Sequence, residues 1–345
     1  MKEYHLDIRS SATRHISDLG PKVKIKTEFG LKPRIGDVVI GQIVKIGQHF
    51  FIEDPFGHEI LLHPGNICAL VLGNRYSTRE FYGEVPNRLN LGDEFSLLNI
   101  GGISGEAKQG NIMVNDPTRL TYLGHACGKE GERINTFDHA PSALTCPSAK
   151  IPIIFVVGTD MDSGKTSTCG LVIRILSENG WQVGAGKITG TSRMKDILYM
   201  KACGAKWIAD FMDLGFPSTS LCTVEDLEGI WDGIRSLITQ EGCHALVLEI
   251  ADGILQPETE RIFSSSRIMK ERSLLVLAAD GSVSAFGAIE YLSNHHHIRP
   301  DFLSGLIINS NLAIREITAK IDIPILNNQT VSRRSLIERL HKKGH

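Results

Sequence analysis

The stretch IPIIFVVGTDMDSGKTST, residues 151–168, joins an apolar run, a polar loop with glycine at both ends and the start of a helical pattern. The apolar run over residues 151–157 predicts a buried strand. Leu171, Ile175 and Leu176 follow at helical spacing, so we expect an amphipathic helix that begins at Lys165. Strand, loop and helix in this order, with Gly-Lys-Thr at the junction, are typical of a phosphate-binding loop. The alternative is an ordinary turn that happens to contain Gly-Lys-Thr.

Each part of this loop has an expected role. Backbone N–H groups from Asp162 to Ser167 can wrap a diphosphate, and the positive end of the helix dipole adds to that attraction. Lys165 would bridge the β- and γ-phosphates, while Thr166 would hold Mg²⁺. Five residues, rather than the more usual four, separate the two glycines. The predicted nucleotide-binding residues of the loop are Gly158, Thr159, Asp160, Asp162, Ser163, Gly164, Lys165, Thr166 and Ser167.

Composition sets the bounds on partners and compartment. The 345 residues carry a formal net charge of −2, which gives no electrostatic reason to expect nucleic acid or an anionic membrane as a partner. No apolar run reaches membrane-spanning length, and the first residues lack the apolar core of a signal peptide. The cysteines are scattered without a CxxC pair, so we expect a reducing, cytoplasmic setting.

The pattern of predicted secondary structure changes near residue 150. Residues 1–140 contain short strand patterns separated by glycine turns, which predict a small β-rich barrel or sandwich domain of unknown role. Residues 141–150 are small, polar and proline-bearing, and we interpret them as a linker. Residues 151–345 alternate apolar strands with helices. We therefore expect an α/β domain with a parallel sheet covered by helices on both faces.

One polar stretch of the first region, residues 74–84, combines two arginines with two tyrosines and several hydroxyls. Arg75 and Arg79 are weak candidates for a substrate carboxylate, because a guanidinium group matches that group with two hydrogen bonds. An ordinary surface loop with aromatic anchors explains the stretch equally well.

In a parallel α/β sheet, ligands bind at the carboxyl ends of the strands. The strand expected over residues 182–188 ends near Lys187 and Thr189, and the strand over 245–250 ends near Glu249 and Asp252. We expect Glu249 to hold Mg²⁺ because the ion prefers hard oxygen ligands beside a triphosphate. A cap or a structural ion pair is the alternative for this glutamate. Thr189 and Asp252 are weak substrate candidates.

The loop Gly-Thr-Asp-Met-Asp-Ser-Gly-Lys-Thr, residues 158–166, resembles the phosphate loop of dethiobiotin synthetase in spacing and in its Gly-Thr-Asp opening. That resemblance implies a P-loop domain over residues 151–345 with Thr166, Asp196 and Glu249 as metal candidates. It also implies that Lys187 faces the γ-phosphate and the acceptor, and that Asn309 reads adenine. Asp196 also has a structural explanation, because an acidic side chain near the N-terminus of a helix interacts favourably with the helix dipole.

A second resemblance is to poorly characterised two-domain proteins that carry this P-loop domain at the carboxyl end. It rests on the run Asp-Phe-Met-Asp-Leu-Gly-Phe-Pro-Ser-Thr, residues 210–219. Neither resemblance covers the first 140 residues, so the first domain is not recognised.

The sequence therefore favours an ATP- and Mg²⁺-dependent, ADP-forming ligase or synthetase that phosphorylates a small-molecule carboxylate or carbamate, with Lys165 and Lys187 as catalytic residues. The partner would be that small-molecule carboxylate or amine. A homodimer is left open. The alternatives are a small-molecule kinase and a nucleotide-hydrolysing regulator or assembly factor whose first domain binds a macromolecule.

Overall fold

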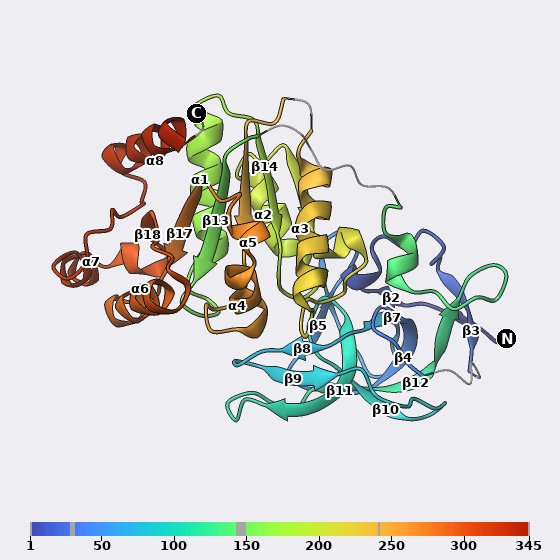
Figure 1. Cartoon of the computed structure of the whole chain (residues 1–345). Helices are drawn as coiled ribbons and strands as arrows, with labels where there is room; N and C mark the ends of the chain where they lie inside the picture. The colour runs from blue at the N-terminus through green and yellow to red at the C-terminus, as the bar shows by residue number, and fades with distance from the viewer. Residues whose placement is uncertain (1, 28–31, 143–149, 241, 344–345) are drawn as a thin grey trace. The chain divides into compact units, whose positions relative to one another are not determined.

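The computed structural model describes residues 2–27, 32–142, 150–240 and 242–343. The chain divides into two compact units, and Figure 1 shows the elements of both. The first unit comprises Met1–Ser142, Thr191–Lys195 and Phe211–Ser220; the second comprises Ala143–Gly190, Asp196–Asp210 and Leu221–His345. Two segments from the later part of the chain therefore belong to the first unit. Most of the expected linker, residues 143–149, lies outside the described residues.

The second unit contains a parallel sheet with the strand order β15-β14-β16-β13-β17-β18. Its strands are β13 (Ile153–Gly158), β14 (Val183–Lys187), β15 (Trp207–Asp210), β16 (Ala245–Glu249), β17 (Leu274–Ala278) and β18 (Phe302–Ser304). Its helices are α1 (Lys165–Glu178), α2 (Met194–Ala202), α3 (Val224–Ile238), α4 (Pro257–Ser264), α5 (Ser266–Met269), α6 (Ser282–His296), α7 (Asn311–Thr318) and α8 (Thr330–Lys343). The predicted α/β class is confirmed.

Alternation along β13 explains why helices cover both faces of this sheet. Ile154 and Val156 are fully buried in a cluster with residues of α1, α2 and α8. Phe155, between them, points to the opposite face and meets Trp231 of α3 edge-on, with ring centroids 5.5 Å apart. Successive strand residues face opposite sides of a sheet, so a continuous apolar run needs cover on both.

The structure corrects some predicted boundaries near the end of the chain. The apolar pattern of residues 303–308 predicts a buried strand with Asn309 at its end. The strand stops at Ser304 instead, and a short 3₁₀ helix, η4 (Leu306–Asn309), follows. Gly305 has φ 90°, and the N–H of Leu306 donates to the Ser163 carbonyl 3.1 Å away, so the chain leaves the sheet there. The expectation that Asn309 ends a buried strand is therefore wrong. The apolar pattern of residues 323–326 predicts one more strand, which in the structure is reduced to a bridge between Leu303 and Ile325.

The first unit is β-rich and mostly antiparallel. Its strands are β1 (Lys2–His5), β2 (Ile8–Arg9), β3 (Lys22–Lys26), β4 (Val38–Lys45), β5 (Phe51–Glu53), β6 (Glu59–Leu61), β7 (Ile67–Leu72), β8 (Arg75–Tyr76), β9 (Phe81–Glu84), β10 (Glu94–Leu97), β11 (Ile103–Gly110) and β12 (Thr118–Cys127). Short 3₁₀ helices, η1 (Ser11–Thr13), η2 (Thr136–His139) and η3 (Phe211–Leu214), complete it.

Strand pairing closes this sheet into a barrel. β12 pairs with β4, β4 with β7, β7 with β11, β11 with β10, and β10 returns to β12. The barrel encloses an apolar core that includes Val39, Leu70, Phe95 and Leu120. The expected β-rich domain is thus a barrel. The polar stretch 74–84, expected as one loop, is instead the antiparallel pair β8 and β9.

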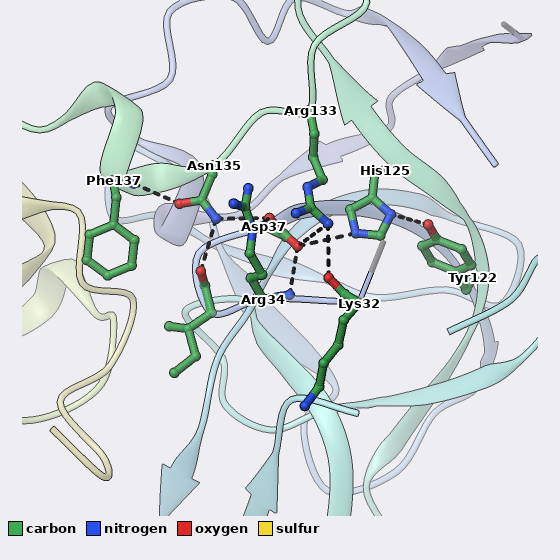
Figure 2. Close-up of polar contacts among 9 residues, drawn as sticks. Lys32, Arg34, Asp37, Tyr122, His125, Arg133, Asn135 and Phe137 are labelled. Atoms are coloured by element: carbon green, nitrogen blue, oxygen red, sulfur yellow. Dashed lines mark hydrogen bonds and ion pairs between the residues drawn. The ribbon is translucent and has the colours of Figure 1, made fainter. Parts of the chain in front are cut away.

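A buried ion pair joins Asp37, just before β4, to Arg133, in the segment that follows β12. Figure 2 shows the Asp37 carboxylate surrounded by donors. The backbone N–H of Arg34 lies 2.8 Å from it, Nδ2 of Asn135 lies 2.9 Å away, and Nη1 of Arg133 lies 3.1 Å away. Asp37 is fully buried, so these donors replace the water that the charge would otherwise need. The imidazole of His125 lies 3.5 Å from the same carboxylate.

Candidate functional site

The loop between β13 and α1 has the shape expected of a phosphate-binding loop. α1 begins at Lys165, as predicted, and Gly164 precedes it with φ 92°. The Lys165 ammonium donates to the Asp160 carbonyl, 2.8 Å away, so it lies across the loop. The Ser163 hydroxyl is buried and has no hydrogen-bond partner among the residues that the structure describes. An unsatisfied buried hydroxyl in such a loop is available to a ligand.

Neighbouring atoms lie close to both glycines of the loop. A Cβ on Gly158 would lie 2.3 Å from Oγ of Ser163, and one on Gly164 would lie 3.1 Å from the backbone of Gly305. The N–H of Thr159 also donates to the Ala278 carbonyl at the end of β17. The loop is therefore held between the ends of β17 and β18. A side chain at Gly158 would clash with Ser163, and one at Gly164 would be crowded by the Gly305 backbone and strained by the positive φ.

The structure brings four of the predicted site residues together at the carboxyl ends of adjacent strands. Lys187 at the end of β14 is in register with Glu249 at the end of β16, and their charged atoms lie 3.6 Å apart. The Thr166 hydroxyl donates to the other oxygen of Glu249, 3.0 Å away. The Lys187 ammonium also forms an ion pair with Asp196, in the first turn of α2. Lys187 thus bridges the two carboxylates.

Burial and charge act in opposite directions at this cluster. Burial favours a lower pKa for the Lys187 ammonium, but the carboxylates of Asp196 and Glu249 outweigh it and raise the pKa. Burial raises the pKa of Glu249, with Lys187 opposing that effect. Burial lowers the pKa of Lys165, against the attraction of Glu249 and Asp252. Lys187 is therefore firmly cationic, held in place by two carboxylates.

The weak candidates Thr189 and Asp252 belong to the same edge of the sheet. The Thr189 hydroxyl donates to the Ala251 carbonyl, and the Thr259 hydroxyl donates to the same carbonyl at 3.0 Å. Thr189 is buried, so its hydroxyl holds the turn after β16 in place. Asp252, one residue further, is half-buried within that turn.

Beside the loop lies a cavity of about 660 Å³, within the range of small-molecule sites. Gly164 and Ser167 line it, which connects it to the phosphate loop. Asn309 lines it too, although it comes from η4 and not from a strand end. The sequence patterns did not indicate several other lining residues, among them Arg174, Tyr199, Asn327, Asn328 and Gln329. Three consecutive amide side chains after an apolar strand pattern were the signal that could have indicated them.

The two arginine candidates lie in the β-rich unit. Arg75 is buried, forms an ion pair with Glu80 and donates to the Thr191 hydroxyl 3.0 Å away. Its guanidinium is therefore largely used in holding β8 to residues 191–195 of that unit. Arg79 is exposed.

The donor set fits a magnesium ion that is held mainly by a nucleotide. Mg²⁺ is usually bound by one or two carboxylates together with phosphate oxygens. Thr166 and Glu249 offer a hydroxyl and a carboxylate 3.0 Å apart beside the start of α1. The Asp196 carboxylate lies on the other side of the Lys187 ammonium, with which it forms an ion pair. No group of three or more His, Cys, Asp or Glu side chains that could hold a metal without such phosphates occurs within the described ranges.

In the part of the chain that the structure describes, no helix is long and apolar enough to cross a membrane. The described cysteines, Cys68, Cys127, Cys169, Cys203, Cys222 and Cys243, are buried free thiols.

Comparison with known proteins finds similarity among solved structures. No family model matches it, and no curated protein matches it. Among solved structures, it is similar to the signal recognition particle receptor FtsY from Elizabethkingia anophelis in complex with GDP, at 17% identity and a TM-score of 0.36 over 55% of this chain and 60% of that one. It is also similar to signal recognition particle 54 kDa protein from Aeropyrum pernix K1 in complex with GDP, at 18% identity and a TM-score of 0.37, over 57% of this chain and 47% of that one. A DUF1611 family protein from Anabaena variabilis is similar at 14% identity and a TM-score of 0.37, over 59% of this chain and 62% of that one. The chain spans less than two thirds of each of these proteins. The P-loop fold of the second unit rests on its own strand, loop and sheet geometry.

Proposed function

We propose that the second unit binds Mg·ATP and transfers its γ-phosphoryl group to a carboxylate or carbamate of a small molecule, releasing ADP. The observation that carries this proposal is the cluster at the ends of β14 and β16, where Lys187, Glu249 and Thr166 meet beside the phosphate loop. A lysine at the neighbouring strand end supplies a positive charge beyond the one in the loop. Two lysines of this kind suit a reaction in which both donor and acceptor are anionic.

Each residue has a defined part in that reaction. The loop N–H groups and the start of α1 bind the phosphates, and Lys165 moves from the Asp160 carbonyl to the β- and γ-oxygens. Lys187 neutralises the transferred phosphoryl group and the acceptor oxygen and keeps them in line. Thr166 and Glu249, with Asp196, would hold a magnesium ion, which when bound supplies positive charge to the phosphates. The reaction needs positioning and charge neutralisation more than a strong base.

The nucleotide base would occupy the cavity beside Gly164 and Ser167. Side-chain amides from Asn309 and Asn327 can donate to and accept from the edge of a base at the same time. We propose ATP over GTP, because no carboxylate that could accept from the guanine amino group lines the cavity among the described residues. Competition between the two nucleotides for the protein tests this preference, and tighter binding of GTP would contradict it.

The reaction itself is tested by trapping. A metabolite screen first identifies compounds that accelerate ADP release. Hydroxylamine is then added, because it converts an acyl phosphate into a stable hydroxamate and leaves an alkyl phosphate intact. A hydroxamate supports carboxylate activation. A stable phosphate ester would assign the chain as a small-molecule kinase, and release of AMP and pyrophosphate would contradict both.

One observation favours a regulated nucleotide hydrolase as the second candidate. Residues 191–195, which connect Lys187 with Asp196, belong to the β-rich unit. Within that unit the Ser192 carbonyl accepts from Asn99 at 2.9 Å. A macromolecule bound to the barrel would therefore act on the segment between two site residues. Turnover that a protein accelerates, and that no small molecule affects, would favour this candidate.

A further inference from the structure

The cavity beside the phosphate loop has a positively charged side chain in its lining. Among the described residues that line it, Arg174 of α1 carries a full charge at neutral pH, and the others are amides, hydroxyls, apolar side chains, glycines and a tyrosine. No carboxylate of the described residues lines the cavity. The lining is therefore polar with a net positive charge, which favours a ligand that brings negative charge to this place.

Arg174 lies in a row of residues that leads away from the phosphate loop. Ser167, Leu171 and Arg174 all line the cavity and follow one another at spacings of four and three residues, so they share one face of α1. The stretch from Ser167 to Arg174 corresponds to about 10 Å of helix. Long side chains on a helix lean toward its N-terminus, which here is the end beside the phosphate loop. A ligand that extends from the loop along α1 therefore meets the Arg174 guanidinium about two turns away.

Arg174 has no role in the fold that accounts for its charge. No hydrogen bond or ion pair joins its side chain to any residue that the structure describes. The acidic residue four positions later, Glu178, would be its ordinary partner on a helix, but Glu178 forms an ion pair with Arg333 of α8. Four positions earlier stands Gly170, which has no side chain to offer. The guanidinium is therefore available to a ligand.

The neighbours of Arg174 suit a nucleoside. A Cβ on Gly170 would lie 2.5 Å from Cε1 of Tyr199, so this ring packs directly on the backbone of α1. Tyr199 is 41% exposed, and it lies within electrostatic range of Arg174. The amides of Asn309 and Asn327 line the same cavity. An aromatic ring, side-chain amides and a guanidinium are groups that bind, in turn, the face of a base, its edge and a phosphate.

We propose that this cavity binds adenine nucleotides that carry a further phosphate on the ribose, at the 2′ or the 3′ oxygen, and that Arg174 binds this phosphate. The inference rests on the nucleotide-binding part of the proposed function. It adds a second class of ligand, which would compete with ATP for the site.

The position of the ribose supports this assignment. With the 5′-phosphates at the start of α1 and the base beside Asn309, the ribose lies between them, over the row of α1 residues. A phosphate on it would accept two charge-assisted hydrogen bonds from the planar guanidinium. ATP has only hydroxyl groups at this position, and they leave the charge of Arg174 without a counter-charge.

The test compares four nucleotides by isothermal titration of the full chain in the presence of Mg²⁺. They are AMP, ADP, adenosine 2′,5′-bisphosphate and adenosine 3′,5′-bisphosphate. ADP has as many phosphates as the bisphosphates but places both of them in the loop. We expect one bisphosphate to bind about tenfold tighter than AMP, and the one that does so identifies the ribose oxygen.

Variants of Arg174 then assign the effect. In Arg174→Gln the advantage of the bisphosphate over AMP should vanish, while the advantage of ADP over AMP should remain. Arg174→Lys keeps the charge but not the paired donors, so it should keep only part of the advantage. The matched control is Arg315→Gln, at an exposed position outside the cavity lining, which should behave as the native chain does.

Two results would overturn the inference. The bisphosphates bind the native chain no tighter than AMP does, or they keep their full advantage in Arg174→Gln. In either case binding of ADP leaves the proposed function standing, whereas a native chain that binds none of the four nucleotides refutes both. Should Arg174→Gln lose ADP binding as well, Arg174→Lys decides, and a full bisphosphate advantage in that variant counts against the inference.

Discussion

The Thr166 hydroxyl donates a 3.0 Å hydrogen bond to Oε2 of Glu249, which ties the first turn of α1 to the end of β16. Glu249 is 2% exposed, and the other oxygen of its carboxylate faces the Lys187 ammonium. Such a carboxylate is costly to bury and is kept only where charges of the opposite sign surround it. The position is thus built for cations, whether an ammonium group or a metal ion that arrives with nucleotide.

Replacement of Lys165 tests the phosphate loop. Lys165→Ala should weaken Mg·ATP binding or lower turnover by about a hundredfold, because it removes the buried cation that would meet the β- and γ-oxygens. The fold should persist, since the lysine donates its hydrogen bond to a loop carbonyl and not to the sheet. Isothermal titration with ATP and a hydrolysis assay measure the effect, with the exposed Lys201→Ala as control. Native affinity and turnover in Lys165→Ala would exclude the loop as the nucleotide site.

Replacement of Lys187 tests whether its ammonium competes with a metal ion. In the structure this ammonium lies between Asp196 and Glu249. Lys187→Met should therefore tighten Mn²⁺ binding to the nucleotide-free protein about tenfold, because two carboxylates lose their internal cation. Electron paramagnetic resonance of free Mn²⁺ measures this directly. ADP release should fall in the same variant. Mn²⁺ affinity equal to that of the native protein would show that the lysine and the ion do not share the position.

The buried Asp37 carboxylate should determine much of the stability of the barrel. Asp37→Asn leaves the Arg133 guanidinium, 6% exposed, without its counter-charge. We expect the free energy of unfolding of this unit to fall by about 3–5 kcal/mol. Amide hydrogen exchange of β4 and β12 measures it, because the tryptophans Trp181, Trp207 and Trp231 all lie in the other unit.

This loss should depend on pH in a defined direction. Burial opposes ionisation of Asp37, but the hydrogen bonds from His125, Asn135 and Arg34, with the charge of Arg133, lower its pKa below 3.8. A lowered carboxylate pKa gives stability that is present above the unfolded value and is lost as the pH falls through the folded one. The difference between native and Asp37→Asn should therefore be full at neutral pH and shrink below about pH 4. A difference that is constant down to pH 2 would contradict the assignment.

The sequence predicted the parts of the site that local pattern determines. The start of α1 at Lys165 follows from Gly-Lys-Thr after an apolar run, and Lys187 and Glu249 follow from the rule that ligands meet strand ends. The early end of β18 could not be predicted, because Gly305 turns out of the sheet to meet Ser163, far away in sequence. The amide residues 327–329 were missed for the same reason, since their role depends on which segment lines the cavity.

In the β-rich unit, residues 74–84 were expected as a loop because a glycine interrupts the apolar alternation of β9. Along β9 the burial alternates, with Phe81 and Gly83 inward. Gly83 has no side chain to show this, and a Cβ there would lie 2.7 Å from Leu98. The pairing of β10 with both β11 and β12, which closes the barrel, joins strands by tertiary contact and leaves no local signal.

The last prediction concerns the two later segments of the β-rich unit. Residues 191–195 and 211–220 pack with residues 2–142, and Phe211, Met212 and Leu214 are buried. Cutting the chain at a protease site engineered within residues 143–149 should therefore leave two fragments that elute together in gel filtration, since separation would expose this apolar surface. Gly101→Ala should weaken the association, because its Cβ would lie 1.8 Å from the Ser192 carbonyl oxygen. Gly20→Ala, where a Cβ meets nothing nearer than 3.8 Å, is the matched control. Fragments that separate freely after cleavage of the native sequence would show that these two segments do not hold the β-rich unit to the rest of the chain.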